Sequence, residues 1–300
     1  MTLWIPVTLT AAIFQTLHFM LQKHLSTGQL TPAGATFARF AYSAPIVVGL
    51  TALWLGTTGQ ALPVMGGRFW AFALAGGLGQ VVATICVVML FKQRNFAVGI
   101  TFAKTEVILT VFIGLILLGE GVGQVAFGAI LLGLVGVLLL SRTPGSVNAW
   151  WRDLVSRATG LGLASGLLFA ISAVSYRGAS LELGTLDPAL RAAITLAAVT
   201  SSQMIGMGAW LFWRDRKEIA AVWNARRVAV WVGLMSMGGS FCWFWAFTLE
   251  NAAYVKGLGQ IELILSLLAT IFVFRERITR REVAGMALLG VSILALIVAV

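Results

Sequence analysis

Long apolar runs are the feature that most constrains the fold of this chain. A helix needs about 20 apolar residues to cross the hydrocarbon core of a bilayer. Ten such runs follow one another along the 300 residues, near 3–22, 33–55, 69–91, 95–118, 122–141, 158–180, 187–213, 228–249, 251–274 and 280–299. Because backbone groups inside a bilayer must be hydrogen-bonded within their own segment, each run is expected to be a helix. The sequence therefore predicts an all-α integral membrane protein with ten transmembrane helices.

The composition excludes the common soluble classes. Hydrophobic residues make up 59% of the chain and charged residues 11%, whereas an ordinary globular domain is about a quarter charged. A cytosolic enzyme, a nucleic-acid-binding domain and a disordered linker are therefore excluded, and the expected partners are a lipid bilayer and a small molecule. Cys86 and Cys242 lie inside apolar runs and match no metal or redox spacing. We expect no cofactor, no metal, no nucleic acid and no enzymatic activity.

The basic residues predict how the chain is oriented. Most of the 21 lysines and arginines lie in the connections after the first, third, fifth, seventh and ninth runs. By the positive-inside rule, this face of the protein is cytoplasmic. Ten spans place both termini on the same side, so both termini are predicted to be outside.

An internal repeat at an offset of 156 residues divides the chain into two halves. The segment NFAVGITFAKTEVILTVFIGLILLGE begins at Asn95, and NAAYVKGLGQIELILSLLATIFVFRE begins at Asn251. Each half holds five spans, and an odd number means that the halves insert in opposite directions. Inverted repeats of this kind let a secondary transporter alternate around a site near the midplane. We predict a 5+5 inverted-topology repeat around a central cavity, with a first repeat at 1–143, a connecting loop at 144–157 and a second repeat at 158–300.

The fourth span of each repeat ends in a similar acidic motif. Leu118-Gly119-Glu120 closes the run in the first half and Arg275-Glu276-Arg277 closes it in the second, and an apolar segment with spaced glycines follows each motif. In these features the chain resembles the drug/metabolite transporter superfamily, in its ten-span EamA-like branch. Within that branch it is similar to the aromatic amino-acid exporters (YddG-like). The first half departs from the usual pattern, because Gly121 stands where an arginine often follows the glutamate.

The resemblance implies a function. It implies a functional monomer in the bacterial cytoplasmic (inner) membrane. This monomer would export small amphipathic metabolites, such as amino acids, including aromatic amino acids, by alternating access. The alternatives are a channel-like or broad-specificity drug/metabolite permease and a non-transporting structural membrane protein.

Ionisable side chains deep in the predicted spans are the first candidates for function, because they are costly in a bilayer and usually face a cavity or a partner. Lys104 and Glu106 lie near the middle of the fourth span, and Gln260 and Glu262 occupy the same positions in the ninth. Lys104 is expected either to bind a substrate carboxylate or to neutralise Glu262, and Gln260 to bind substrate. Glu106 and Glu262 are assigned to coupling or to buried ion pairs. Arg39 is assigned to the same group, paired with a buried carboxylate.

Polar stripes on otherwise apolar spans complete the predicted site. Gln15 and His18 share one face of the first span, where lipid would offer them no partner. The third and eighth spans carry matching pairs at i and i+4, namely Gln80 with Thr84 and Ser236 with Ser240. Trp243 follows one turn later, and its ring would suit stacking against an organic substrate. These residues are predicted to bind substrate, and the alternative is that they serve helix packing.

Two further residues, Tyr176 and Lys256, are candidates for gates near the outer ends of the sixth and ninth spans. Phe244 and Phe247 lie beside Trp243 in the sequence and favour a packing role for that segment. The polar, glycine-rich hairpins of spans 3–4 and 8–9 are predicted to move about the midplane and to open the cavity to each side in turn.

Overall fold

The chain forms a bundle of helices. The computed structural model describes residues 3–28, 30–91, 102–140, 157–265 and 280–299, and within these ranges it contains no strand. The helices are α1 (Trp4–Gly28), α2 (Pro32–Thr58), α3 (Gly67–Phe91), α5 (Glu106–Leu118), α6 (Gln124–Leu140), α8 (Arg157–Leu181), α9 (Pro188–Arg214), α10 (Arg216–Asn224), α11 (Arg226–Leu249), α12 (Ala252–Gly259) and α14 (Arg280–Ala299).

Each predicted apolar run contains one of these helices. The start of the run at 95–118, the end of the run at 251–274 and nearly all of the connecting loop lie outside the described residues. The charged segment from Arg214 to Lys217 separates α9 from the short helix α10, since α9 ends at Arg214 and α10 begins at Arg216. Asp215 caps this helix by accepting a hydrogen bond from the Lys217 amide at 3.2 Å, so the charged segment starts a short helix instead of a loop.

Local sequence signals explain where several helices begin and end. Thr31 caps α2 through a hydrogen bond from the Gly34 amide at 3.1 Å, and Pro32 stands at the first helical position. Asp187 and Pro188 begin α9 in the same way. A proline at this position costs no hydrogen bond, because the first amides of a helix have no partner within it. The dipeptides Thr31-Pro32 and Asp187-Pro188 therefore mark helix starts.

Among the described residues, five helices are long and apolar enough to cross a membrane: α2, α3, α8, α9 and α11. Helices α5 and α6 and the segment Val283–Ala299 of α14 are shorter and apolar. Many large apolar side chains on the outside of the bundle are exposed, as in Ile116 and Val298, which suits a surface that faces lipid. A multi-pass membrane protein is supported, and the count of ten spans stays a prediction.

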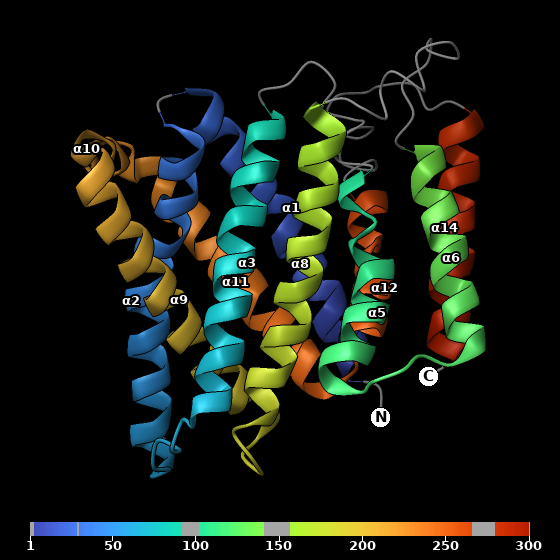
Figure 1. Cartoon of the computed structure of the whole chain (residues 1–300), viewed down its shortest axis with the longest axis horizontal. Helices are drawn as coiled ribbons and strands as arrows, with labels where there is room; N and C mark the ends of the chain where they lie inside the picture. Colours follow the sequence, from blue (N-terminus) through green and yellow to red (C-terminus); the bar gives the residue numbers. More distant parts are fainter. Residues whose placement is uncertain (1–2, 29, 92–101, 141–156, 266–279, 300) are drawn as a thin grey trace.

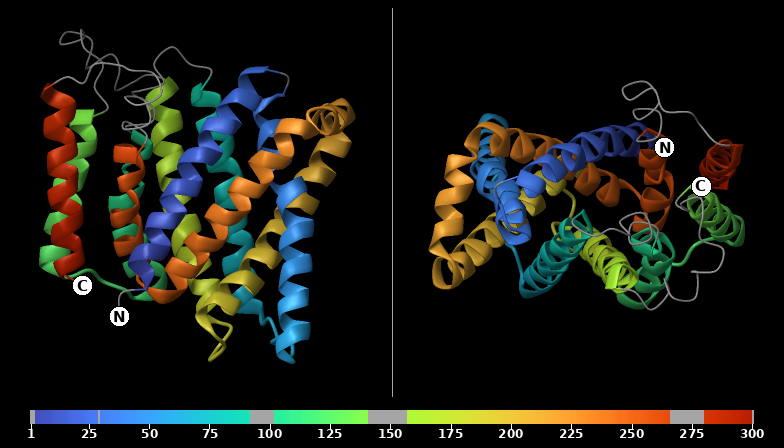
Figure 2. Two further views of the ribbon diagram at one scale, coloured as in Figure 1. Left: turned by 180° about the vertical axis from the view of Figure 1, so that it is seen from behind. Right: turned by 90° about the horizontal axis from the view of Figure 1, so that it is seen from above.

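The main helix contacts join the first half of the sequence to the second. Helix α3 packs on α8, α1 on α11, α2 on α9 and α6 on α14. Helix α8 runs in the opposite direction to α1, and α1 begins at the same end of the bundle at which α14 finishes (Figures 1 and 2). The α6–α14 contact is especially close, because a Cβ atom on Gly136 or on Gly285 would lie 3.0 Å from the carbonyl oxygen of the other. The division into two repeats and the outside location of the termini stay predictions.

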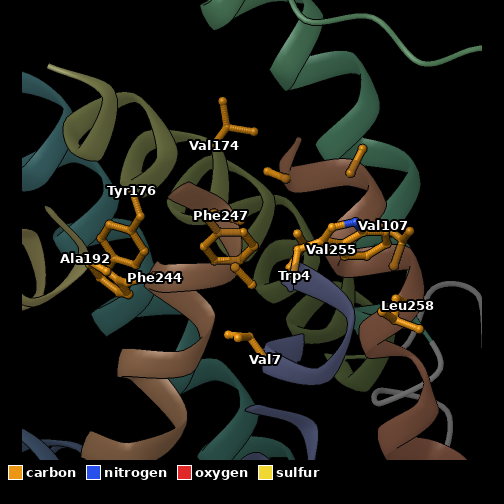
Figure 3. Packing of buried hydrophobic residues seen from close by; sticks show 14 of the residues in the cluster. Trp4, Val7, Val107, Val174, Tyr176, Ala192, Phe244, Phe247, Val255 and Leu258 are labelled. Atoms are coloured by element: carbon orange, nitrogen blue, oxygen red, sulfur yellow. The ribbon is translucent and has the colours of Figure 1, made fainter. Parts of the chain in front are cut away.

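An aromatic and aliphatic core fills the centre of the bundle (Figure 3). Tyr176 of α8 stacks on Phe244 of α11, with ring centroids 4.2 Å apart. Phe247, Trp4 and Val255 extend the same cluster to α1 and α12. Because lipid tails are as apolar as these side chains, close packing and not burial from water holds such helices together.

Two helix interruptions occur at positions related by the 156-residue offset. A turn at Lys104 and Thr105 precedes α5, and a turn at Gln260 follows α12. Both turns lie in segments that the apolar pattern predicts as single continuous spans. Broken helices leave backbone groups without helical partners and are tolerated at membrane depth where protein or a cavity surrounds them.

Candidate substrate-binding cavity

A narrow cavity lies among six helices at the centre of the bundle. It is lined by residues of α1, α2, α3, α8, α11 and α12: Gln15, Arg39, Gln80, Phe169, Ser172, Ala173, Tyr176, Ser240, Trp243, Phe244, Phe247 and Lys256. Its volume is about 40 Å³, whereas pockets that hold small organic ligands usually measure about 300–1,000 Å³. The space in this conformation therefore suits a few water molecules, and an organic substrate would require the lining to move.

The cavity brings together five residues of the predicted site from four different helices. These are Gln15, Arg39, Gln80, Ser240 and Trp243. They come from positions as far apart in the sequence as the first and eighth predicted spans. Their convergence gives the cavity amide, hydroxyl, guanidinium and indole groups.

The other predicted site residues lie outside the cavity lining. His18, Thr84 and Ser236 are buried between helices. Gln260 is also buried and lies against α6, since a Cβ atom on Gly133 would be 3.0 Å from its Oε1 atom. Lys104, Glu106 and Glu262 take part in ion pairs.

Helix α8 contributes lining residues that the sequence did not single out as substrate-binding. Phe169, Ser172 and Ala173 are small or apolar residues on an apolar helix, and nothing in their spacing marks them. Tyr176 and Lys256, which the sequence indicates as gates, line the cavity as well. The sequence feature that indicates a polar face on α8 is the spacing of Ser172 and Tyr176 at i and i+4, which places both residues on the same side of the helix.

Gln80 is held in a fixed orientation by two donors. The Tyr176 hydroxyl donates to Gln80 Oε1 at 2.9 Å, and Gln203 Nε2 donates to the same atom at 2.9 Å. Gln203 also donates to the Gly77 carbonyl at 2.9 Å. Because the carbonyl oxygen of Gln80 is occupied twice, its amide NH₂ is the group that it can offer to a ligand.

Arg39 places a buried positive charge at the cavity. Its side chain is 4% exposed, and its Nη2 atom donates to Ser240 Oγ at 3.0 Å. No carboxylate forms an ion pair with it within the part of the chain that the structure describes. The hydrogen-bond partner in this conformation is the neutral hydroxyl of Ser240, and the pairing of Arg39 with a buried carboxylate stays a prediction. A buried charge without a counter-ion is costly.

Lys256 brings a second positive charge to the lining. Its Nζ atom lies 3.6 Å from Glu106 Oε1. The same atom is 5.0 Å from the ring centroid of Trp243, 5.8 Å from Phe169 and 5.9 Å from Phe247. Aromatic faces attract cations at these distances, so the lysine is held among three rings as well as by a carboxylate.

Lys104 forms an ion pair with Glu262, and both side chains are largely buried. The pair joins the turn that precedes α5 to the segment that follows α12. A second ion pair, between Lys256 and Glu106, joins the same two parts of the chain, with the lysine now on α12 and the glutamate on α5. The sequence left open whether Lys104 binds substrate or neutralises Glu262, and the contact in this conformation is the second of these.

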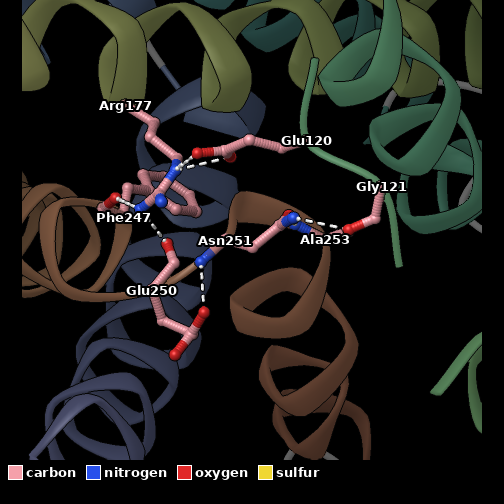
Figure 4. Close-up of polar contacts among 7 residues, drawn as sticks. All are labelled: Glu120, Gly121, Arg177, Phe247, Glu250, Asn251 and Ala253. Carbon is pink, nitrogen blue, oxygen red and sulfur yellow. Dashed lines mark hydrogen bonds and ion pairs between the residues drawn. The ribbon is translucent and has the colours of Figure 1, made fainter. Parts of the chain in front are cut away.

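A hydrogen-bond network surrounds Arg177, the residue that follows the cavity residue Tyr176 in α8 (Figure 4). Arg177 Nε donates to both carboxylate oxygens of Glu120, at 2.9 and 2.7 Å, and Nη1 donates to the carbonyls of Phe247 and Glu250 at 2.6 Å each. Asn251 Nδ2 donates to the Gly121 carbonyl at 3.3 Å. The loops after α5 and α11 are thereby tied to α8, next to the cavity residues Tyr176 and Phe247.

The packing of Trp243 leads to a prediction for Gly259. A Cβ atom on Gly259 would overlap the indole ring of Trp243. We expect Gly259→Ala to displace the ring and to weaken substrate binding by about two- to tenfold, the range that corresponds to one aromatic contact. Binding of labelled substrate to purified protein measures the effect. Gly290→Ala is the matched control, because a Cβ atom there meets nothing within 4 Å; equal affinity of both variants and the unsubstituted protein would contradict the prediction.

No group of three or more histidine, cysteine, aspartate or glutamate side chains suitable for a metal ion occurs within the described ranges.

Comparison with known proteins shows what the chain is similar to. The EamA-like transporter family model matches residues 157–298. No curated protein matches the chain. A solved crystal structure, of a protein not further described, superposes with a TM-score of 0.68 at 15% identity and covers 97% of this chain and 99% of its own. At that identity the likeness shows the fold alone. The second half of the chain is therefore similar to the EamA-like transporter family, which supports a multi-pass membrane transporter of small molecules related to the drug/metabolite transporter superfamily.

Proposed function

We propose that the protein is a secondary transporter that exports small amphipathic metabolites across the bacterial cytoplasmic membrane, with aromatic amino acids as its best-fitting substrates. The observation that carries the proposal is Arg39, a guanidinium that is 4% exposed, lines the cavity and has a hydroxyl as its partner. A substrate carboxylate would supply the missing counter-ion, and the planar fork of arginine suits it.

The rest of the lining supports the same class of substrate. The amide NH₂ of Gln80 and the hydroxyl of Ser240 can donate to the carboxylate beside Arg39. Trp243 and Phe247, whose rings stack with centroids 5.8 Å apart, supply apolar faces to the same cavity. The amide oxygen of Gln15 is an acceptor for a substrate amine. An anionic end and an apolar end are the two features of an amphipathic acid.

The small size of the cavity supports alternating access. About 40 Å³ cannot admit an amino acid, so the lining helices must separate for binding and release. The Arg177 network would have to break for the cavity to open at the end where α1 begins. We propose that the two broken segments around α5 and α12 move in this step, as the hairpin prediction states, in a monomer whose termini lie outside.

Reconstituted protein tests the proposal. Efflux of labelled phenylalanine from proteoliposomes is expected to saturate and to be competed by unlabelled tryptophan and by phenylpropionate, which keeps the carboxylate and lacks the amine. Phenethylamine, which lacks the carboxylate, is expected to compete weakly. Each assay is run with and without a pH gradient, and a difference between the two rates would indicate that transport is coupled to protons. Flux that never saturates would indicate a channel-like or broad permease, and absence of flux for every compound would favour a structural protein.

A further inference from the structure

A second hollow lies outside the central cavity, on the surface of the bundle. Helices α3, α8 and α5 lie side by side in that order (Figure 1), and α3 and α5 both pack on α8. The groove that they form measures about 630 Å³, a size typical of ligand pockets. Most of its lining is aliphatic: Ala71 and Ala75 from α3, Ile113 and Ile116 from α5, and Leu167 and Ile171 from α8.

The position of the groove determines what it can hold. It runs along helices α3 and α8, both long and apolar enough to span a membrane, and Ile116 on its wall is 78% exposed. The lining on α8 extends from Leu167 to Ser175, a rise of about 12 Å at 1.5 Å per residue. One leaflet contributes about half of a hydrocarbon core that is about 30 Å thick. The groove therefore has nearly the length of the acyl region of one leaflet.

A positive charge stands at one end of the groove. Arg68 lies in the first turn of α3 and shares a helix face with Ala71 and Ala75. Its side chain is 86% exposed, and Nη1 lies 3.9 Å from Glu182 Oε1. An exposed pair at that separation is weak, so the guanidinium can bind a phosphate at the edge of the apolar region.

We propose that this groove is a phospholipid-binding site, in which one acyl chain lies between α3 and α5 against α8 and the headgroup phosphate binds Arg68. The bound chain braces α5 on the side away from the cavity. Helix α5 begins at Glu106, which forms an ion pair with the cavity residue Lys256, so lipid in the groove acts on the central site through this ion pair.

Lipid binding can be measured without any transport assay, which makes this test independent of the proposed function. Delipidated protein in detergent is titrated with palmitoyl-oleoyl-phosphatidylglycerol, and the affinity for the first bound lipid is read by native mass spectrometry. Ala75→Trp fills the groove and is expected to weaken binding by about tenfold or more, since it displaces the chain from its apolar walls. Arg68→Gln is expected to weaken it by about fivefold.

The controls separate this groove from general lipid contact. Ala52→Trp adds the same ring to an exposed position of α2 outside the groove and is expected to bind lipid like the unsubstituted protein. Soluble glycerol phosphate is expected not to displace the lipid, because the chain supplies most of the affinity. Unchanged affinity of Ala75→Trp, or displacement by glycerol phosphate at a concentration comparable to that of the lipid, would overturn the proposal. If Ala75→Trp does not fold, Ala71→Trp makes the same test one turn away.

Discussion

Substitution of Arg39 by glutamine is expected to weaken the binding of a carboxylate-bearing substrate by about 10- to 100-fold. That range corresponds to loss of a hydrogen bond to a charged group, which is worth about 1.5–3 kcal/mol. The guanidinium is buried at the cavity and donates only to Ser240 among the contacts that the structure describes, so a substrate carboxylate would be its counter-ion. Equilibrium binding of labelled phenylalanine to purified protein measures the loss, and phenethylamine, which has no carboxylate, should lose little.

Two companion variants separate binding of substrate from a structural role of Arg39. Arg39→Lys keeps the charge and loses the planar fork, so we expect an intermediate affinity. Ser240→Ala removes the hydroxyl that joins α11 to the guanidinium and leaves the charge in place, so we expect lower thermal stability with a smaller change in affinity. If Arg39→Gln lowers the thermal stability as Ser240→Ala does but leaves the affinity for phenylalanine unchanged, Arg39 serves only to connect α2 to α11, and the proposed substrate contact is wrong.

The sequence predicts the helices and part of the site because both depend on local pattern. The apolar runs and the pairs Thr31-Pro32 and Asp187-Pro188 mark helices that the structure contains. A polar residue on an apolar span must face protein or a cavity, which is a property of that residue alone. This reasoning finds Gln15, Gln80 and Ser240, all of which line the cavity.

The remainder of the site depends on which helices become neighbours, and a single sequence does not state this. Phe169 and Ala173 line the cavity because α8 packs on α3, yet each is an ordinary residue for a membrane helix. The contact of Arg39 with Ser240 likewise depends on the packing of α11 on α2, which the depth of Arg39 in its span does not reveal. In the sequence, Arg177 is a basic residue near the end of a span like several others. Its ion pair with Glu120 forms only in the folded chain.

The ion pair of Lys104 with Glu262 gives the largest predicted effect on stability. Their side chains are 12% and 13% exposed, and removing one member of a buried pair typically costs about 3–5 kcal/mol, because the other charge is left without a partner. Glu262→Gln is therefore expected to lower the melting temperature of the purified protein by about 10 °C, and Lys104→Met by a similar amount. Scanning fluorimetry in detergent measures both shifts.

A double substitution distinguishes an ion pair from two independent contributions. Lys104→Met combined with Glu262→Met removes both charges and replaces them with apolar side chains, so most of the lost stability should return. Glu106→Gln is the matched comparison, because its partner Lys256 keeps the rings of Trp243, Phe169 and Phe247 around it and should tolerate the loss better. The double variant should also bind labelled phenylalanine with nearly unchanged affinity, since neither residue lines the cavity. The opposite result is that the losses of stability in the two single variants add in the double variant and that the double variant no longer binds phenylalanine. In that case Lys104 binds the substrate, which is the other role that the sequence allows.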